Sequence, residues 1–181
     1  NHSIRISNYL KLSSSHLLSS YHMNGNINDK IITVSPAGYK GVYTYGTCVY
    51  IKENYNTRKY IFSGASAGAW NALMMTCKRD IQYFKKEILD YSIQNSKNIM
   101  DMETLIKEQI LSHYKTDDFD LSRLYIGVTV YDHFSFKTKI FSDFDHLEDA
   151  INCCIASSHI PFITSRNFNI YYFNYCRLFE S

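Results

Sequence analysis

The feature that most constrains the fold is a short glycine-serine turn at residues 64–68, Gly-Ala-Ser-Ala-Gly. Residues 59–63 (KYIFS) before it have the composition of a buried strand. Residues 66–77 (SAGAWNALMMTC) are small and apolar, which favours a helix packed closely on a sheet. A serine on such a turn projects at the edge of the sheet, above the N–H groups and positive dipole end of the helix. The pattern predicts a nucleophile elbow at Ser66; the plainer alternative is a turn whose serine only caps the helix.

Two further segments also follow predicted elements closely. Residues 31–35 (IITVS) predict a buried strand, and residues 36–41 (PAGYKG) follow it with small residues that let backbone N–H groups approach a ligand. Residues 155–161 (IASSHIP) end a predicted helix at a proline. Taken singly, the first is an ordinary strand-to-helix turn and the second an ordinary helix end.

The remaining pattern alternates strands with helices. Residues 42–53 predict a helix, with a strand as the alternative because of their β-branched residues. Further helices are predicted over residues 80–95 (with Asp80 as N-cap), 101–114 and 145–156, and further strands over residues 124–131 and 135–141. This order predicts an α/β fold with three layers, in which helices cover both faces of a mostly parallel sheet.

Composition excludes several other classes. The 181 residues carry a formal net charge of +2, which with no basic run argues against a nucleic-acid partner. Five cysteines without a CxxC spacing support neither a disulfide framework nor a zinc site, and a reducing interior of the cell suits them best. Residues 1–22 are rich in serine and contain no acidic residue, so they are interpreted as a disordered or extraneous leader to a single domain over residues 23–181.

In this order, the three turn segments resemble the motifs of the patatin-like phospholipase family. Residues 36–41 are similar to the family's GGGxRG-type loop, although Pro36 and Ala37 replace two glycines and Lys40 replaces the arginine. Residues 64–68 match its GxSxG elbow, and residues 156–161 match its ASSxxP-type segment. Residues 129–132 resemble the strand before that segment, and the resemblance covers about residues 31–163.

The resemblance implies a serine-dependent lipid acyl hydrolase of lipid metabolism, acting on phospholipid or acylglycerol esters through an acyl-enzyme. It implies these site residues: Ser66 as nucleophile; Gly64 and Gly68 as the elbow glycines; the amides of Ala37, Gly38 and Ala67 as oxyanion donors; and Lys40 and Gly41 in the same loop. It implies no metal and no cofactor. The expected partner is a lipid substrate, met by peripheral contact with membranes or lipid aggregates, and the expected location is inside the cell.

The family's catalytic aspartate has no counterpart, because no aspartate follows Asp149. The domain is therefore interpreted as C-terminally incomplete or altered, with residues 166–181 as an atypical tail, and as nearly inactive. One alternative is a non-catalytic lipid-binding or interaction domain. Another is a Ser-His-Asp esterase that uses His159 with Asp143 or Asp145. Less favoured candidate bases are Asp132, His133 and His146.

Overall fold

The computed structural model describes residues 5–7, 30–132 and 135–160 of the chain. These residues form an α/β protein whose sheet has the strand order β1-β2-β3-β4-β5. The strands are β1 (Arg5–Ser7), β2 (Lys30–Val34), β3 (Tyr60–Ala65), β4 (Leu124–Asp132) and β5 (Ser135–Phe141). Of the predicted leader, residues 1–22, the structure describes only the three residues of β1. The predicted tail, residues 166–181, lies outside the described residues.

Every predicted helix is present, with ends shifted by a few residues. The helices are α1 (Gly41–Asn54), α2 (Ala67–Thr76), α3 (Ile81–Phe84), α4 (Tyr91–Asn95), α5 (Ile99–His113) and α6 (Leu147–Ser158). A π-helical stretch, Lys85–Asp90, joins α3 to α4, so the segment predicted as one helix over residues 80–95 is nearly continuous. Its predicted N-cap is confirmed, because the Asp80 carboxylate accepts a hydrogen bond from the Gln82 amide at 2.8 Å.

The sheet is mixed, which corrects the expectation of a mostly parallel sheet. Strands β2, β3 and β4 are parallel neighbours, whereas β1 pairs antiparallel with β2 and β5 pairs antiparallel with β4. The β4–β5 pairing follows from the connection, because a parallel partner needs a crossover of roughly a dozen residues and residues 133–134 alone join these strands.

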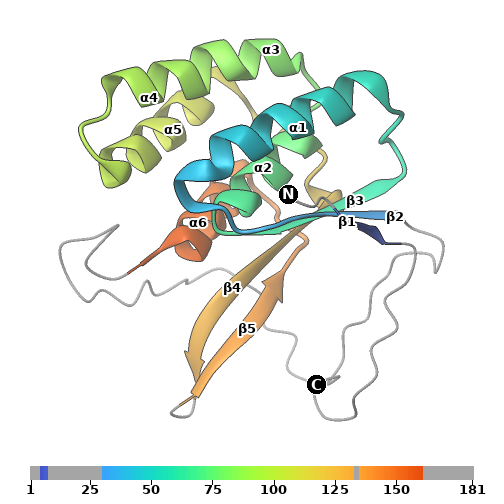
Figure 1. The fold of residues 1–181 in the computed structure, drawn as a ribbon, viewed down its shortest axis with the longest axis vertical. Coiled ribbons are helices and arrows are strands. Elements are labelled where there is room, and N and C mark those ends of the chain that lie inside the picture. Colours follow the sequence, from blue (N-terminus) through green and yellow to red (C-terminus); the bar gives the residue numbers. More distant parts are fainter. Residues whose placement is uncertain (1–4, 8–29, 133–134, 161–181) are drawn as a thin grey trace.

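The helices α1 to α5 lie together on one side of strands β1–β3, and the β4–β5 hairpin extends away from them (Figure 1). Helix α6 packs on α2 and β4. Right-handed crossovers between parallel strands in sequential order place their helices on the same face of a sheet, which explains this arrangement. A second helical layer, expected from the sequence, is not seen among the described residues.

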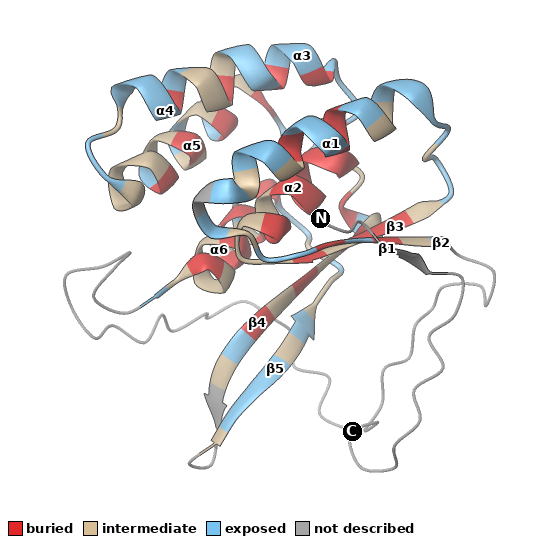
Figure 2. Ribbon diagram, viewed as in Figure 1, coloured by how far each residue is buried: buried red, intermediate tan, exposed pale blue. Residues whose placement is uncertain are grey.

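The core lies between this helical layer and the sheet, where Figure 2 shows the buried residues. The register aligns Ile32, Phe62 and Leu124 across β2, β3 and β4, and each of these side chains is 1% exposed or less. Ala69 and Ala72 of α2 are fully buried, and their small size lets α2 approach the sheet closely. The sequence prediction of a small-residue helix against the sheet is thus confirmed.

A lysine from α1 holds the far end of α2. The Lys52 ammonium donates to the carbonyl oxygens of Met74 at 3.3 Å and Met75 at 3.1 Å, and to the carbonyl oxygen of Cys77. These carbonyls carry the negative end of the helix dipole, so a cation there stabilises the helix. Burial lowers the pKa of Lys52 to about 8. Helix α2 is therefore fixed at its C-terminal end, which helps to fix the turn at its other end.

Candidate active site

Ser66 occupies the turn between β3 and α2, with φ 54° and ψ −132°. Among the described residues, Ser66 and Asp143 are the non-glycine residues with positive φ. A side chain held in this region costs about 1–3 kcal/mol and persists where the surrounding structure enforces it. The predicted strand-to-helix turn with strained backbone at Ser66 is therefore confirmed.

The two glycines of the turn are required by contact rather than by dihedral angle. A Cβ atom on Gly64 would lie 2.1 Å from the Gly68 carbonyl oxygen. A Cβ atom on Gly68 would lie 2.2 Å from the Val34 carbonyl oxygen at the end of β2. The absence of both side chains therefore lets the start of α2 rest against the ends of β2 and β3.

The predicted oxyanion loop lies beside this elbow. A Cβ atom on Gly41 would be 2.7 Å from the Ala67 Cβ, and the Asn71 side-chain amide donates to the Gly41 carbonyl at 3.2 Å. Gly38 has φ 51°, a left-handed conformation that suits glycine. Gly41, the last residue of the loop, and Ala67, the residue after the serine, are thus neighbours.

Within this loop, some amides are already engaged. The Lys40 amide donates to the Ala37 carbonyl at 3.0 Å, and the Gly41 amide donates to the Gly38 carbonyl. The predicted donors are the earlier amides, those of Ala37 and Gly38, so this internal bonding is compatible with their proposed role. The Lys40 side chain is exposed.

The start of α2 can offer further donors. The first N–H groups of a helix have no acceptor within the helix, and they carry the positive end of its dipole. The Ala69 amide bonds back to the Ser66 carbonyl at 2.8 Å, which leaves Ala67 and Gly68 as the first amides of α2 beside the serine. An anion that develops next to Ser66 would meet this positive helix end.

The end of α6 is bound directly to the elbow. The Ser157 hydroxyl accepts a hydrogen bond from the Ser66 amide at 2.7 Å and donates to the Gly127 carbonyl of β4 at 2.6 Å. The third motif therefore supports the serine's backbone through a side chain 91 residues away. Because its hydrogen is already donated, the Ser66 amide is not a candidate oxyanion donor in this arrangement.

The next serine connects the elbow helix to a buried carboxyl group. The Ser158 hydroxyl accepts from the Trp70 indole N–H at 3.0 Å and donates to the Cys154 carbonyl at 3.0 Å. Glu103 of α5 is 8% exposed, and burial raises its pKa to about 7, while the nearby Ser158 hydroxyl acts on this pKa in the opposite direction. A carboxyl group that is partly protonated near neutral pH therefore lies beside Ser158, where the Trp70–Ser158 hydrogen bond joins α2 to α6.

The sequence analysis included Ser157 and Ser158 in the third motif without assigning either a role, and it missed Glu103. Their spacing did carry a signal for two of them: Glu103 precedes Ile106 and Ile110 by three and seven residues, and Ser158 follows Cys154 and Ile151 by four and seven. Those spacings place both on buried helix faces. Nothing local in the sequence predicts that Ser157 bonds to Ser66, because that bond depends on how α6 docks.

The geometry argues against the proposed Ser-His-Asp alternative. Asp143 and Asp145 precede α6, whereas His159 caps its C-terminal end. The 12 residues of α6 separate them by about 18 Å, so neither aspartate pairs with His159. Asp143 is exposed and accepts a hydrogen bond from the Ser142 hydroxyl at 3.0 Å.

The other candidate bases are only partly described. His146 is exposed at the start of α6, the backbone of Asp132 ends β4, and His133 lies outside the described residues. In the part of the chain that the structure describes, no group of three or more His, Cys, Asp or Glu side chains could hold a metal ion. Across the same residues, no helix has the length and apolar character needed to cross a bilayer.

Comparison with protein-family models, with curated proteins and with solved structures found no match for this chain.

Proposed function

We propose that the chain is a serine-dependent acyl hydrolase of the patatin-like type, acting on ester bonds of phospholipids or acylglycerols. The observation that carries the proposal is the strained backbone of Ser66 at the start of α2, with a glycine-containing loop on one side and the α6 serines on the other. A strained non-glycine residue in a buttressed turn is typical of functional sites. The three-layer patatin-like arrangement is part of this proposal.

The reaction would run through a covalent intermediate. The Ser66 hydroxyl oxygen attacks the ester carbonyl carbon, the alcohol portion leaves with the serine's proton, and an acyl-enzyme remains. Water then attacks the same carbonyl, which releases the fatty acid and restores the serine. The amides of Ala37, Gly38 and Ala67 would bind the negative oxygen in both steps, with the α2 dipole adding to the stabilisation.

Residues 162–181 contain no aspartate that could act as the family-type base, so we propose that turnover by residues 1–181 alone is slow. General-base assistance contributes about 10²–10⁴-fold to such reactions. The same absence favours a second function, a lipid-binding domain that keeps the elbow without catalysis. In either case, the lipid partner and a peripheral position at membranes or lipid aggregates inside the cell belong to the proposal.

Labelling with a fluorophosphonate distinguishes the two functions. The purified chain is incubated with the reagent, digested, and the modified peptide is identified by mass spectrometry. We expect one adduct, on Ser66, and none in Ser66→Ala. Ser112→Ala, at an exposed serine in the last turns of α5, is the matched control and should label like the unmodified chain. A folded chain with no adduct on Ser66 would refute the hydrolase proposal and favour the lipid-binding function.

A further inference from the structure

The last turn of α6 ends in two neighbouring serines that bind different parts of the elbow region. The Ser157 hydroxyl bonds to backbone groups, the Ser66 amide and the Gly127 carbonyl. The Ser158 hydroxyl bonds to the Trp70 indole in the first turn of α2. Ser157 therefore acts directly on the backbone of the candidate nucleophile, whereas Ser158 acts on the helix that follows it.

The peptide groups on both sides of Ser66 are held by hydrogen bonds. The Ser66 amide donates to the Ser157 hydroxyl at 2.7 Å, and the Ser66 carbonyl accepts from the Ala69 amide at 2.8 Å. The angles φ and ψ are the rotations between these two peptide groups, so the two bonds together hold φ at 54° and ψ at −132°. The Ala69 bond belongs to the turn itself, and the Ser157 bond is the contact that α6 supplies.

The Ser157 hydroxyl lies where the pairing of β3 with β4 ends. Ala65 opposite Gly127 is the last pair of that register, and Ser66 follows it. At this point the hydroxyl accepts from Ser66 on the β3 side and donates to Gly127 on the β4 side at 2.6 Å. Donation to a carbonyl of the sheet fixes the rotation of the hydroxyl, so the lone pair that accepts from Ser66 has a fixed direction. Ser66 thus leaves the strand with its amide still bonded.

We propose that Ser157 is a positioning residue, which holds the Ser66 backbone in the conformation from which the Ser66 hydroxyl reacts. The inference rests on the proposed function for the reaction itself. Without the Ser157 hydroxyl, one of the two bonds that oppose the strain at Ser66 is lost, and φ can relax toward the negative values that non-glycine residues prefer. That rotation turns the Cα–Cβ bond and displaces the reacting hydroxyl, and a misplacement of about 1 Å can cost about 10²-fold in rate.

The rate of fluorophosphonate labelling at Ser66 measures this positioning. Ser157→Ala removes the hydroxyl and Ser157→Thr keeps it. Circular dichroism gives the folded fraction of each variant, and each rate constant is divided by that fraction. We expect Ser157→Ala to label roughly tenfold or more slowly than the unmodified chain, and Ser157→Thr to recover to within about threefold. A role in stability alone predicts equal rates after this correction.

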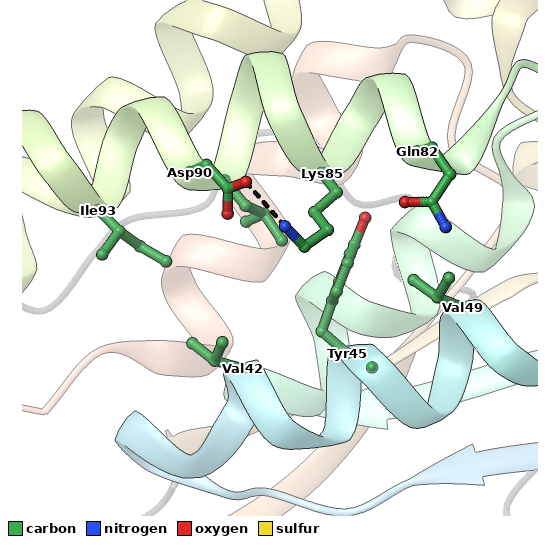
Figure 3. A pocket seen from close by; sticks show the side chains of 9 residues that line it. Val42, Tyr45, Val49, Gln82, Lys85, Asp90 and Ile93 are labelled. Atoms are coloured by element: carbon green, nitrogen blue, oxygen red, sulfur yellow. Dashed lines mark hydrogen bonds and ion pairs between the residues drawn. The ribbon is translucent and has the colours of Figure 1, made fainter.

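Two controls lose a buried hydroxyl that does not bond to the Ser66 backbone. Tyr45→Phe removes the bond from the Tyr45 hydroxyl to the Ile81 carbonyl, at 3.3 Å, beside a cavity of about 250 Å³ between α1 and the α3–α4 segment (Figure 3). Its labelling rate should be unchanged, because this bond joins α1 to α3 rather than to α6. Ser158→Ala removes the bond to Trp70 and should slow labelling less than Ser157→Ala does.

Hydrogen exchange of the Ser66 amide, followed by NMR, tests the bond without requiring a reactive serine. We expect this amide to exchange faster in Ser157→Ala, and at the unmodified rate in Ser157→Thr and Tyr45→Phe. An unchanged exchange rate in Ser157→Ala would mean that Ser157 does not hold the Ser66 backbone.

Three labelling results overturn the proposal: Ser157→Ala at the unmodified rate, equal slowing in Ser157→Ala and Ser158→Ala, or a folded Ser157→Thr that is as slow as Ser157→Ala. The proposed hydrolysis fails separately, because an unmodified chain without an adduct on Ser66 refutes the hydrolase. The exchange rates then decide alone whether Ser157 holds the Ser66 backbone.

Discussion

Replacing Glu103 by glutamine should stabilise the chain in a way that depends on pH. Glu103 is buried on α5 near the Ser158 hydroxyl, and burial raises its pKa from the ordinary 4.5 to about 7. The folded state therefore holds a proton on Glu103 between about pH 4.5 and pH 7, where the unfolded chain has already released it. The stability that this proton contributes is full below about pH 4.5 and is lost as the pH rises through about 7.

The magnitude follows from the two pKa values. Each tenfold change in proton affinity is worth about 1.36 kcal/mol, so the rise from 4.5 to about 7 corresponds to about 3 kcal/mol. Glutamine keeps the size and hydrogen-bonding groups of a protonated glutamate and carries no charge. The free energy of unfolding of Glu103→Gln should therefore equal that of the unmodified chain near pH 4.5 and exceed it by up to about 3 kcal/mol at pH 8.

Urea unfolding followed by circular dichroism, at pH 4.5, 6 and 8, measures these differences. Glu108→Gln is the matched control, since Glu108 lies on the same helix with its side chain exposed. The control should change stability little, and equally at each pH. If Glu103→Gln has the same effect at pH 4.5 and pH 8, the carboxyl group does not titrate near neutral pH and the reasoning is wrong.

Three further substitutions test the elbow. Ser157→Ala should cost about 1–3 kcal/mol in urea unfolding, because the Ser66 amide and the Gly127 carbonyl both lose their partner, and an unchanged stability would mean that water replaces the hydroxyl. Gly68→Ala should cost more than 2 kcal/mol by the same measurement, since its methyl group would meet the Val34 carbonyl oxygen at 2.2 Å; a loss below 1 kcal/mol would contradict the close approach. Ser66→Gly should raise the free energy of unfolding by about 1 kcal/mol while removing all fluorophosphonate labelling, because glycine adopts the positive φ of 54° without strain. A destabilised Ser66→Gly would indicate that the serine side chain supports the turn.

The sequence predicted what local pattern determines. The GxSxG turn, the small-residue helix after it and the Asp80 cap all depend on neighbouring residues, and the structure has each of them. The sheet was predicted as mostly parallel, whereas β1 and β5 at its two edges pair antiparallel; for β5 the short connection at residues 133–134 requires this direction. The hydrogen bond from the Ser66 amide to Ser157 depends on the docking of α6, which local sequence does not determine. Glu103 was not predicted as a buried residue, because charged side chains are rarely buried, although its spacing places it on the buried face of α5.

The bond between Ser66 and Ser157 also sets an order in time. Residues 64–68 are synthesised well before the hydroxyl that holds their backbone, since 91 residues separate the two partners. At about 5–20 residues per second, that interval is on the order of 5–20 seconds. During it, the growing chain carries its candidate nucleophile on an unsupported turn. The elbow is therefore completed only after α6 has been synthesised, and a chain released before α6 would expose a serine without its supporting hydroxyl.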